Sequence, residues 1–291
     1  MRHRDLGPAA TSVSIIGYGG MHISIDGRPS EAVSVGVIHA ALDAGVTLID
    51  TADVYCLDHT DIGHNERLIA GALRSWSGPR DQIVIATKGG ITRPAGRWER
   101  DGSPRHLREA CEHSLLALGV ERIDLYQLHA PDPAVPFEET VGTLAELRRE
   151  GKVRWVGLSN VSVDEIRRAE AIVPITTVQN RLNPFFREAL TEGVVRYCGG
   201  RGIGFLAYSP TGGGRLTKKL PEHPVLRQIA TRLGVSTHAV VLAWGLAQGP
   251  TVISIPSART IEHARDAAGA GDLVLDAADL HAIDTAEFSR A

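Results

Sequence analysis

Eight short apolar runs recur along the chain, each rich in valine, isoleucine or leucine. They are Ile15–Gly17, Val46–Ile49, Ile83–Ala86, Ile123–Leu128, Val153–Leu158, Thr176–Val178, Ile203–Ala207 and Val252–Ile255. Their hydrophobicity is nearly continuous and lacks the strict alternation of a strand with one solvated face. The pattern therefore predicts eight strands that are buried on both faces.

Apolar residues at helical spacing fill the segments between these runs, as Val141, Leu144 and Leu147 do after Pro136. Serines stand where helix N-caps are expected, at Ser30, Ser103 and Ser162. Glycines stand where the helices should end, at Gly45, Gly119, Gly151 and Gly202. Strand and helix thus alternate from one end of the chain to the other.

Eight βα repeats within 291 residues predict an α/β fold in which the strands close into a parallel (β/α)8, or TIM, barrel. An open, doubly wound sheet shares the local pattern and is the alternative. No linker rich in proline or serine divides the chain, so we expect one domain over residues 1–291. The segment Arg2–Val13 predicts an added N-terminal β-hairpin, and Ala277–Phe288 predicts an extra C-terminal helix.

Polar residues directly follow the predicted strands, and in a parallel barrel all of these positions lie on one rim. Asp50 and Tyr55 come after the second run, Lys88 after the third and His129 after the fourth. These four side chains could therefore converge on one pocket.

The chemistry of these four residues is coherent. A phenol is a weak acid at neutral pH, and an adjacent ammonium such as that of Lys88 favours the phenolate and lowers the pKa of Tyr55. Asp50 would keep Lys88 charged and oriented, and His129 could donate a hydrogen bond to a substrate oxygen.

Composition narrows the choice of partners and location. A formal net charge of −3 offers no attraction to a polyanion, so we expect no nucleic-acid partner. The basic N-terminus precedes no apolar run of signal-peptide length, and no later stretch is long enough to span a membrane. We expect a soluble cytoplasmic protein with no membrane partner, whereas no pattern indicates its oligomeric state.

The cysteines and histidines predict no metal site. Cys56, Cys111 and Cys198 are odd in number and far apart, which favours reduced thiols over disulfides or a zinc site. His59 and His64 lie together on one loop, but a flexible loop lacks the rigid support that metal sites need.

The ordered motifs of the chain resemble those of the aldo-keto reductase family from end to end. The matching stretches are Gly17-Tyr18-Gly19-Gly20-Met21, Asp50-Thr51-Ala52-Asp53-Val54-Tyr55, Asn65-Glu66-Arg67-Leu68-Ile69, Ala86-Thr87-Lys88, Asp124-Leu125-Tyr126-Gln127-Leu128-His129, Gly151-Lys152-Val153-Arg154, Gly157-Leu158-Ser159-Asn160, Val178-Gln179-Asn180, Ala207-Tyr208-Ser209-Pro210 and Ile255-Pro256-Ser257-Ala258-Arg259. The resemblance implies reversible NADPH-dependent reduction of an aldehyde or ketone to an alcohol. The hydride would come from nicotinamide and the proton from Tyr55.

The same resemblance implies a role for each site residue. The catalytic tetrad would be Asp50, Tyr55, Lys88 and His129, and Tyr55, His129 and Trp98 would contact the carbonyl substrate. The nicotinamide carboxamide would bind Ser159, Asn160 and Gln179, and Tyr208 would stack on its ring. The full set of implied cofactor residues is Gly20, Met21, Asp50, Ser159, Asn160, Gln179, Tyr208, Ser209, Pro210, Thr211, Gly212, Ser257, Arg259 and His263.

The last motif favours NADPH over NADH. Ser257 and Arg259 resemble ligands for the adenosine 2′-phosphate, and a guanidinium suits a dianionic phosphate by charge and by paired hydrogen bonds. The chain departs from the family pattern at His263, where glutamine is common, and at Ala267, where an adenine-contacting asparagine is common.

A second departure is the lengthened loop Cys56–His64, which we expect to overhang the substrate pocket. Together with the polar segment Arg93–Arg100, it favours a polar carbonyl substrate, such as a sugar-like ketone or a pyridoxal-type aldehyde.

Two other classes of function remain as hypotheses. One is an NADPH-binding regulatory subunit that senses redox state with little turnover, against which the intact tetrad argues. The other is lyase or isomerase chemistry on a barrel, with Lys88 as a Schiff-base amine.

Overall fold

The computed structural model describes residues 1–8 and 11–291. Within them, eight parallel strands run side by side in the order β12-β11-β10-β9-β8-β5-β4-β3. Their bounds are β3 (Tyr18–Gly19), β4 (Leu48–Asp50), β5 (Val84–Gly89), β8 (Ile123–Leu128), β9 (Val153–Ser159), β10 (Ile175–Arg181), β11 (Gly204–Tyr208) and β12 (Val252–Ser254). The eight predicted strands are therefore all present, with ends shifted by up to three residues.

The two outer strands meet and close the sheet into a barrel. The Gly17 amide donates to the Ser254 carbonyl (2.8 Å), and the Ser254 amide donates to the Ile15 carbonyl (3.0 Å). Ile16 and Ser254 form a parallel bridge at this seam. The (β/α)8 prediction is confirmed, and the alternative of an open sheet is wrong.

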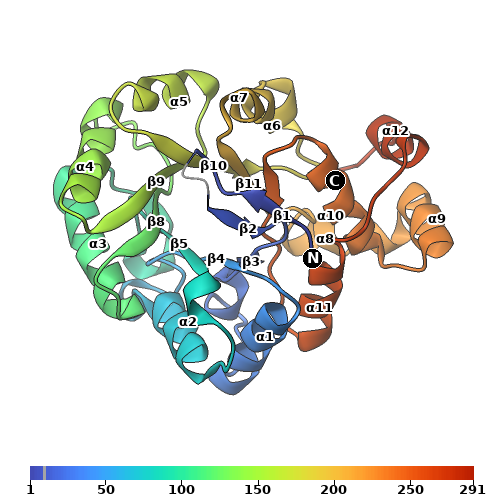
Figure 1. The fold of residues 1–291 in the computed structure, drawn as a ribbon, viewed down its shortest axis with the longest axis horizontal. Helices are drawn as coiled ribbons and strands as arrows, with labels where there is room; N and C mark the ends of the chain where they lie inside the picture. Colours follow the sequence, from blue (N-terminus) through green and yellow to red (C-terminus); the bar gives the residue numbers. More distant parts are fainter. Residues whose placement is uncertain (9–10) are drawn as a thin grey trace.

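A ring of helices surrounds the barrel (Figure 1). After successive strands come α1 (Glu31–Asp43), α2 (His64–Ser75), α3 (Pro104–Leu118), α4 (Phe137–Arg149), α5 (Val163–Glu170), α6 (Glu188–Thr191), α7 (Val194–Arg201), α8 (Gly214–Thr217), α9 (Pro224–Leu233), α10 (Thr237–Ala247), α11 (Ile261–Gly269) and α12 (Ala277–Thr285). Short 3-10 turns occur at η1 (Met21–Ile23), η2 (His59–Asp61), η3 (Arg80–Gln82), η4 (Pro94–Gly96) and η5 (Leu220–Glu222).

Local signals in the sequence explain where several helices begin and end. Ser30, Ser103 and Ser162 each accept a backbone N–H bond as N-caps, and Ser162 forms a full capping box with Glu165. Gly119 and Gly202 end α3 and α7 in the left-handed conformation that glycine adopts without strain.

The N-terminal hairpin closes one end of the barrel. Strands β1 (His3–Asp5) and β2 (Ser12–Ser14) pair antiparallel, as predicted, and residues 9–10 lie outside the described residues. Leu6 and Val13 join the apolar cluster inside the barrel. A Cβ at Gly204 would collide with the Leu6 carbonyl oxygen, so only glycine allows this close approach.

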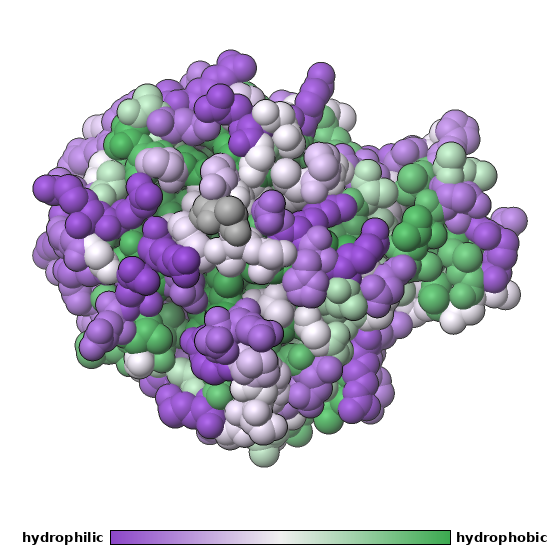
Figure 2. Space-filling model, in the orientation of Figure 1, coloured by the Kyte–Doolittle hydropathy of each residue, from purple (hydrophilic) through white to green (hydrophobic). Residues whose placement is uncertain are grey.

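Figure 2 shows this hairpin-covered face in space-filling form, in the orientation of Figure 1. Hydrophilic residues are spread across it, and apolar residues gather on the protrusion where Figure 1 places α9 and α12. Because the strands begin at this end, their carboxyl ends, with the residues of interest, lie at the opposite end of the barrel.

Two features of the structure differ from the sequence prediction. The C-terminal helix ends at Thr285, short of the predicted Phe288, because the Phe288 ring stacks on His223 (4.2 Å between centroids) and contacts Phe185. A second hairpin, β6 (Ile91–Thr92) with β7 (Glu99–Arg100), was not predicted.

Within residues 1–8 and 11–291, no single helix is both long and apolar enough to cross a membrane. Helices α9 and α10 reach the required length only as a pair, and they meet at a bend of 96°.

Candidate active site

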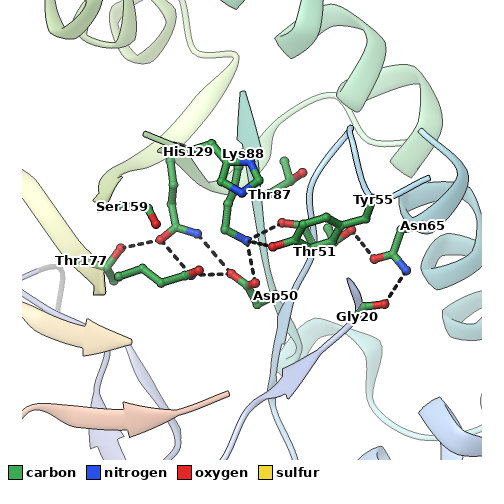
Figure 3. A network of polar contacts seen from close by, with 12 residues as sticks. Gly20, Asp50, Thr51, Tyr55, Asn65, Thr87, Lys88, His129, Ser159 and Thr177 are labelled. Carbon is green, nitrogen blue, oxygen red and sulfur yellow. Dashed lines mark hydrogen bonds and ion pairs between the residues drawn. The ribbon is translucent and has the colours of Figure 1, made fainter. Parts of the chain in front are cut away.

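A buried lysine lies at the centre of the polar network at the carboxyl ends of β4 and β5 (Figure 3). The Lys88 side chain is 0% exposed, and its Nζ donates to Asp50 Oδ1 (2.6 Å), the Thr51 carbonyl (2.8 Å) and Tyr55 Oη (3.1 Å). The ammonium therefore has three acceptors, and one of them belongs to a carboxylate. A buried charge needs such a partner.

Burial and charge set the protonation states of this pair. Burial lowers the pKa of Lys88, but Asp50 and Tyr55 outweigh it and leave the pKa above its ordinary value. Burial raises the pKa of Tyr55, and the Lys88 charge acts in the opposite direction without cancelling it. Lys88 thus lowers the pKa of Tyr55, as predicted, but burial raises it by more. The pKa of Tyr55 is therefore above its ordinary value, and the phenol keeps its proton at neutral pH.

His129 lies beside Tyr55 as the third aromatic group of a small cluster. The Tyr55 and His129 ring centroids are 5.8 Å apart, and Trp98 lies 6.4 Å from Tyr55 and 6.5 Å from His129, all in edge contacts. Burial, and then the charge of Lys88, hold the pKa of His129 well below its usual range. The imidazole is therefore neutral at neutral pH.

The second oxygen of Asp50 is held by two amides. Gln179 Nε2 donates to Asp50 Oδ2 at 2.7 Å and Gln127 Nε2 at 3.3 Å. Gln127 was not predicted as a site residue. Its amide stands within the apolar run Ile123–Leu128 and is fully buried, and a buried amide needs hydrogen-bond partners, so its position in the sequence was a signal for a polar site. These bonds fix the carboxylate that orients Lys88.

A cavity of about 1060 Å³ opens beside Tyr55 and extends to the N-terminus of α11. Its size is at the upper end for small-molecule sites, so it has room for a dinucleotide as well as a substrate. Most of the predicted site residues line it: Met21, Asp50, Tyr55, Trp98, His129, Ser159, Asn160, Gln179, Tyr208, Ser209, Pro210, Thr211, Ser257, Arg259 and His263.

Three predicted site residues lie behind the cavity wall. Lys88 is covered by its own partners. Gly20 packs so tightly against Asn65 that a Cβ would collide with the amide oxygen, and Gly212 packs against Phe185 and Leu216. These two glycines therefore shape the wall, and the structure does not bring their own atoms into the lining.

The far end of the cavity is organised by Arg259. Its Nε donates to the His22 carbonyl (3.0 Å) and its Nη2 to the Asp26 carbonyl (3.1 Å), which holds the guanidinium beside the cavity. His22, Lys218 and His238 also line this cavity and were not predicted, because each comes from a loop or helix with no motif to mark it.

The donor set and backbone of this cavity fit a nicotinamide dinucleotide. Asn160 and Ser209 adopt left-handed backbone angles (φ 60° and 46°) although neither is glycine, and strain of this kind is typical of ligand sites. The Tyr208 hydroxyl donates to Asn160 Oδ1 (2.8 Å), so the ring and the amide are held together in the wall.

Comparison with known proteins identifies the family. The family model described as "Aldo/keto reductase family" matches residues 15–287. The chain belongs to the aldo/keto reductase family. It is 36% identical to the probable aldo-keto reductase 1 of Glycine max, over 96% of this chain and 86% of that protein.

Solved structures of aldo/keto reductases have the same fold. A thermostable aldo-keto reductase crystallised with the inhibitor epalrestat superimposes with a TM-score of 0.82 at 28% identity, covering 98% of this chain and 99% of that one. An aldo/keto reductase from Klebsiella pneumoniae in complex with NADP and acetate has a TM-score of 0.81 at 26% identity, covering 98% and 95%. The recognition of the family and the predicted oxidoreductase class are thus confirmed.

The long loop of this aldo/keto reductase does not lie where the sequence placed it. No residue of the described segment Cys56–His64 lines the cavity beside Tyr55. The loop instead folds back and contains η2, whose last residue, Asp61, binds Arg28 (2.6 Å). His64, the first residue of α2, contacts the Ser24 hydroxyl through Nδ1 (2.8 Å). The prediction that it overhangs the substrate pocket is therefore wrong.

Proposed function

We propose that this aldo/keto reductase interconverts an aldehyde or ketone and its alcohol, using NADPH, with Tyr55 as the proton donor in the direction of reduction. The chain is an NADP-dependent oxidoreductase of this family. The assignment of Tyr55 rests on two observations: Tyr55 lines the cavity, and its hydroxyl lies 3.1 Å from the buried Lys88 ammonium.

The protonation states support Tyr55 as an acid. With a raised pKa, the phenol holds its proton until a strongly basic alkoxide develops beside it. Lys88 then stabilises the phenolate that remains, because its ammonium stays charged beside Asp50. Bound nicotinamide supplies the hydride in this reaction.

His129 and Trp98 would position the carbonyl group. The neutral imidazole can donate one hydrogen bond to the carbonyl oxygen without competing for the proton. The Trp98 ring borders the same part of the cavity and is 47% exposed, so it provides an apolar wall for the substrate.

The cofactor would be held along the rest of the cavity. Ser159, Asn160 and Gln179 would bind the carboxamide, and Tyr208 would stack on the ring. Backbone from Ser209 to Thr211 would follow the pyrophosphate, with Gly212 supporting it from behind the wall. Ser257 and Arg259 would bind the 2′-phosphate, with His263 near the adenosine.

Titration of the purified protein with NADPH and with NADH, followed by intrinsic fluorescence, tests this proposal. A panel of aldehydes and ketones is then added while the absorbance of the reduced nicotinamide is followed. We expect tighter binding of NADPH and carbonyl-dependent oxidation. Absence of NADPH binding would overturn the proposal, and binding without turnover on any carbonyl would overturn the catalytic part of it.

A further inference from the structure

A second cavity of about 510 Å³ lies next to the first, on the other side of Ile91, which lines both. It is bounded by η2, by the segment from β6 to η4, and by one face of α3. His59, Glu109 and His113 are exposed members of its lining, so solvent reaches it. No step of the proposed reaction uses this cavity.

Arg93, in the wall of the second cavity, is a buried cation with incomplete hydrogen bonding. The residue is 6% exposed, and its Nη2 donates to the carbonyls of Cys56 (3.1 Å) and Leu57 (2.8 Å). Its Nε and Nη1 are buried and have no partner. In the part of the chain that the structure describes, no carboxylate forms an ion pair with it.

This arrangement is unfavourable for the protein alone. A buried charge is normally paired, and each buried donor without an acceptor costs stability. Guanidinium N–H groups form their strongest hydrogen bonds with carboxylate and phosphate oxygens. An oxyanion in the second cavity would therefore supply both the missing charge and the missing acceptors.

The remaining polar groups of the cavity are compatible with an anion. His106 Nε2 is buried without a partner, so the imidazole offers a second free donor in the tautomer that carries its proton on Nε2. Burial, and then the charge of Glu66, raise the pKa of Asp53 well above its ordinary value, which favours the uncharged form of this carboxyl group. The other carboxylate, Glu109, is exposed and lies 3.9 Å from Arg105.

We propose that the second cavity is a binding site for the carboxylate or phosphate group of a small molecule, with Arg93 as its main ligand and His106 as a second donor. This site is separate from the one that binds the reacting carbonyl. Trp98 stands between them, because the Arg93 guanidinium stacks on its ring (3.9 Å to the centroid) while the ring contacts Tyr55 and His129 edge-on.

Isothermal titration of the NADP⁺-saturated enzyme with inorganic phosphate, and separately with acetate, tests the site. Saturation with NADP⁺ removes the cofactor's own phosphate contacts from the measurement. We expect saturable binding of at least one probe at one site, with a Kd of about 1 mM or tighter. The two probes distinguish a phosphate ligand from a carboxylate ligand.

Arg93→Met should weaken the binding about tenfold to a hundredfold, as expected for loss of a charged hydrogen-bond donor. The matched control is Arg97→Met, which removes a charge from the same segment but from a 67% exposed side chain paired with Glu99. It should bind the probe as wild type does. Equal weakening in both variants, or no saturable binding of either probe to wild type, would overturn the proposal.

His106→Phe provides a second variant that keeps the Arg93 bonds to the loop. It should also weaken the probe, by less than Arg93→Met, and unchanged binding would remove His106 from the site. NADP⁺ affinity is measured in every variant before phosphate is added. Failure of the cofactor proposal is therefore seen separately from failure of the anion site.

Discussion

Lys88 and Arg93 are two buried cations near Tyr55, and their surroundings differ. Lys88 donates to three oxygens, one of them a carboxylate. Arg93 donates to two backbone carbonyls, leaves Nε and Nη1 without acceptors, and reaches Tyr55 only through the ring of Trp98.

The comparison separates a complete site from an incomplete one. The network around Lys88 is satisfied within the chain, so it is preorganised for the proton transfer proposed for Tyr55. Two donors of Arg93 have no acceptor within the described residues, and the oxyanion proposed for the second cavity would supply one.

Tyr55→Phe removes the group that the Lys88 network serves. We expect kcat for carbonyl reduction to fall about 10²–10⁴-fold, because only the proton donor is lost. NADPH should bind as it does to wild type, since the ring that borders the cavity remains. Steady-state kinetics and a fluorescence titration test this, and turnover at the wild-type rate would show that Tyr55 is not the acid.

Asp50→Asn and Arg93→Met test the stability of the two cations directly. Breaking the buried pair of Asp50 and Lys88 should lower the free energy of unfolding by about 3–5 kcal/mol. Removal of Arg93 should cost no more than about 1 kcal/mol, because relief of an unpaired buried charge offsets two lost hydrogen bonds. Urea unfolding measures both, and equal losses would mean that Arg93 is as well satisfied as Lys88.

Arg259→Ala extends the comparison to an arginine whose bonds are also to backbone carbonyls. We expect NADPH to bind about tenfold to a hundredfold more weakly, with little change for NADH. Arg265→Ala is the matched control, because Arg265 is an exposed residue of the neighbouring helix α11. This substitution should affect the binding of neither cofactor. Equal losses for both cofactors would remove the 2′-phosphate from the role of Arg259.

The smallest expected effect is that of pH on the reductive reaction. The pKa of His129 is shifted down and that of Tyr55 is shifted up, so neither group changes protonation between about pH 7 and pH 9. We expect kcat/KM to vary less than about twofold over this range and to fall at higher pH, as Tyr55 loses its proton. A step near pH 7 would contradict the neutral state of His129.

Much of the fold could be predicted because its signals are local. A strand buried on both faces is apolar at most of its positions, so runs such as Ile123–Leu128 and Val153–Leu158 marked their strands. The meeting of Asp50, Tyr55, Lys88 and His129 was predictable for a related reason. A parallel barrel brings all carboxyl ends of its strands to one rim, whatever their separation in sequence.

Other features depend on contacts between distant segments and had no local signal. The Cys56–His64 loop was expected over the substrate pocket, but Arg28 and Ser24 hold it elsewhere. Phe288 fits the amphipathic pattern of a helix, yet its contacts with Phe185 and His223 end that helix early.

Residue type and order along the chain were enough to predict the (β/α)8 barrel, the family and the residues that meet at Tyr55. Only the tertiary structure decided that Gln127 and Gln179 both bind Asp50 and that Arg93 is buried without a counter-charge. The physical reason is that burial and pairing of a charge depend on which distant groups surround it, and no local pattern specifies those neighbours.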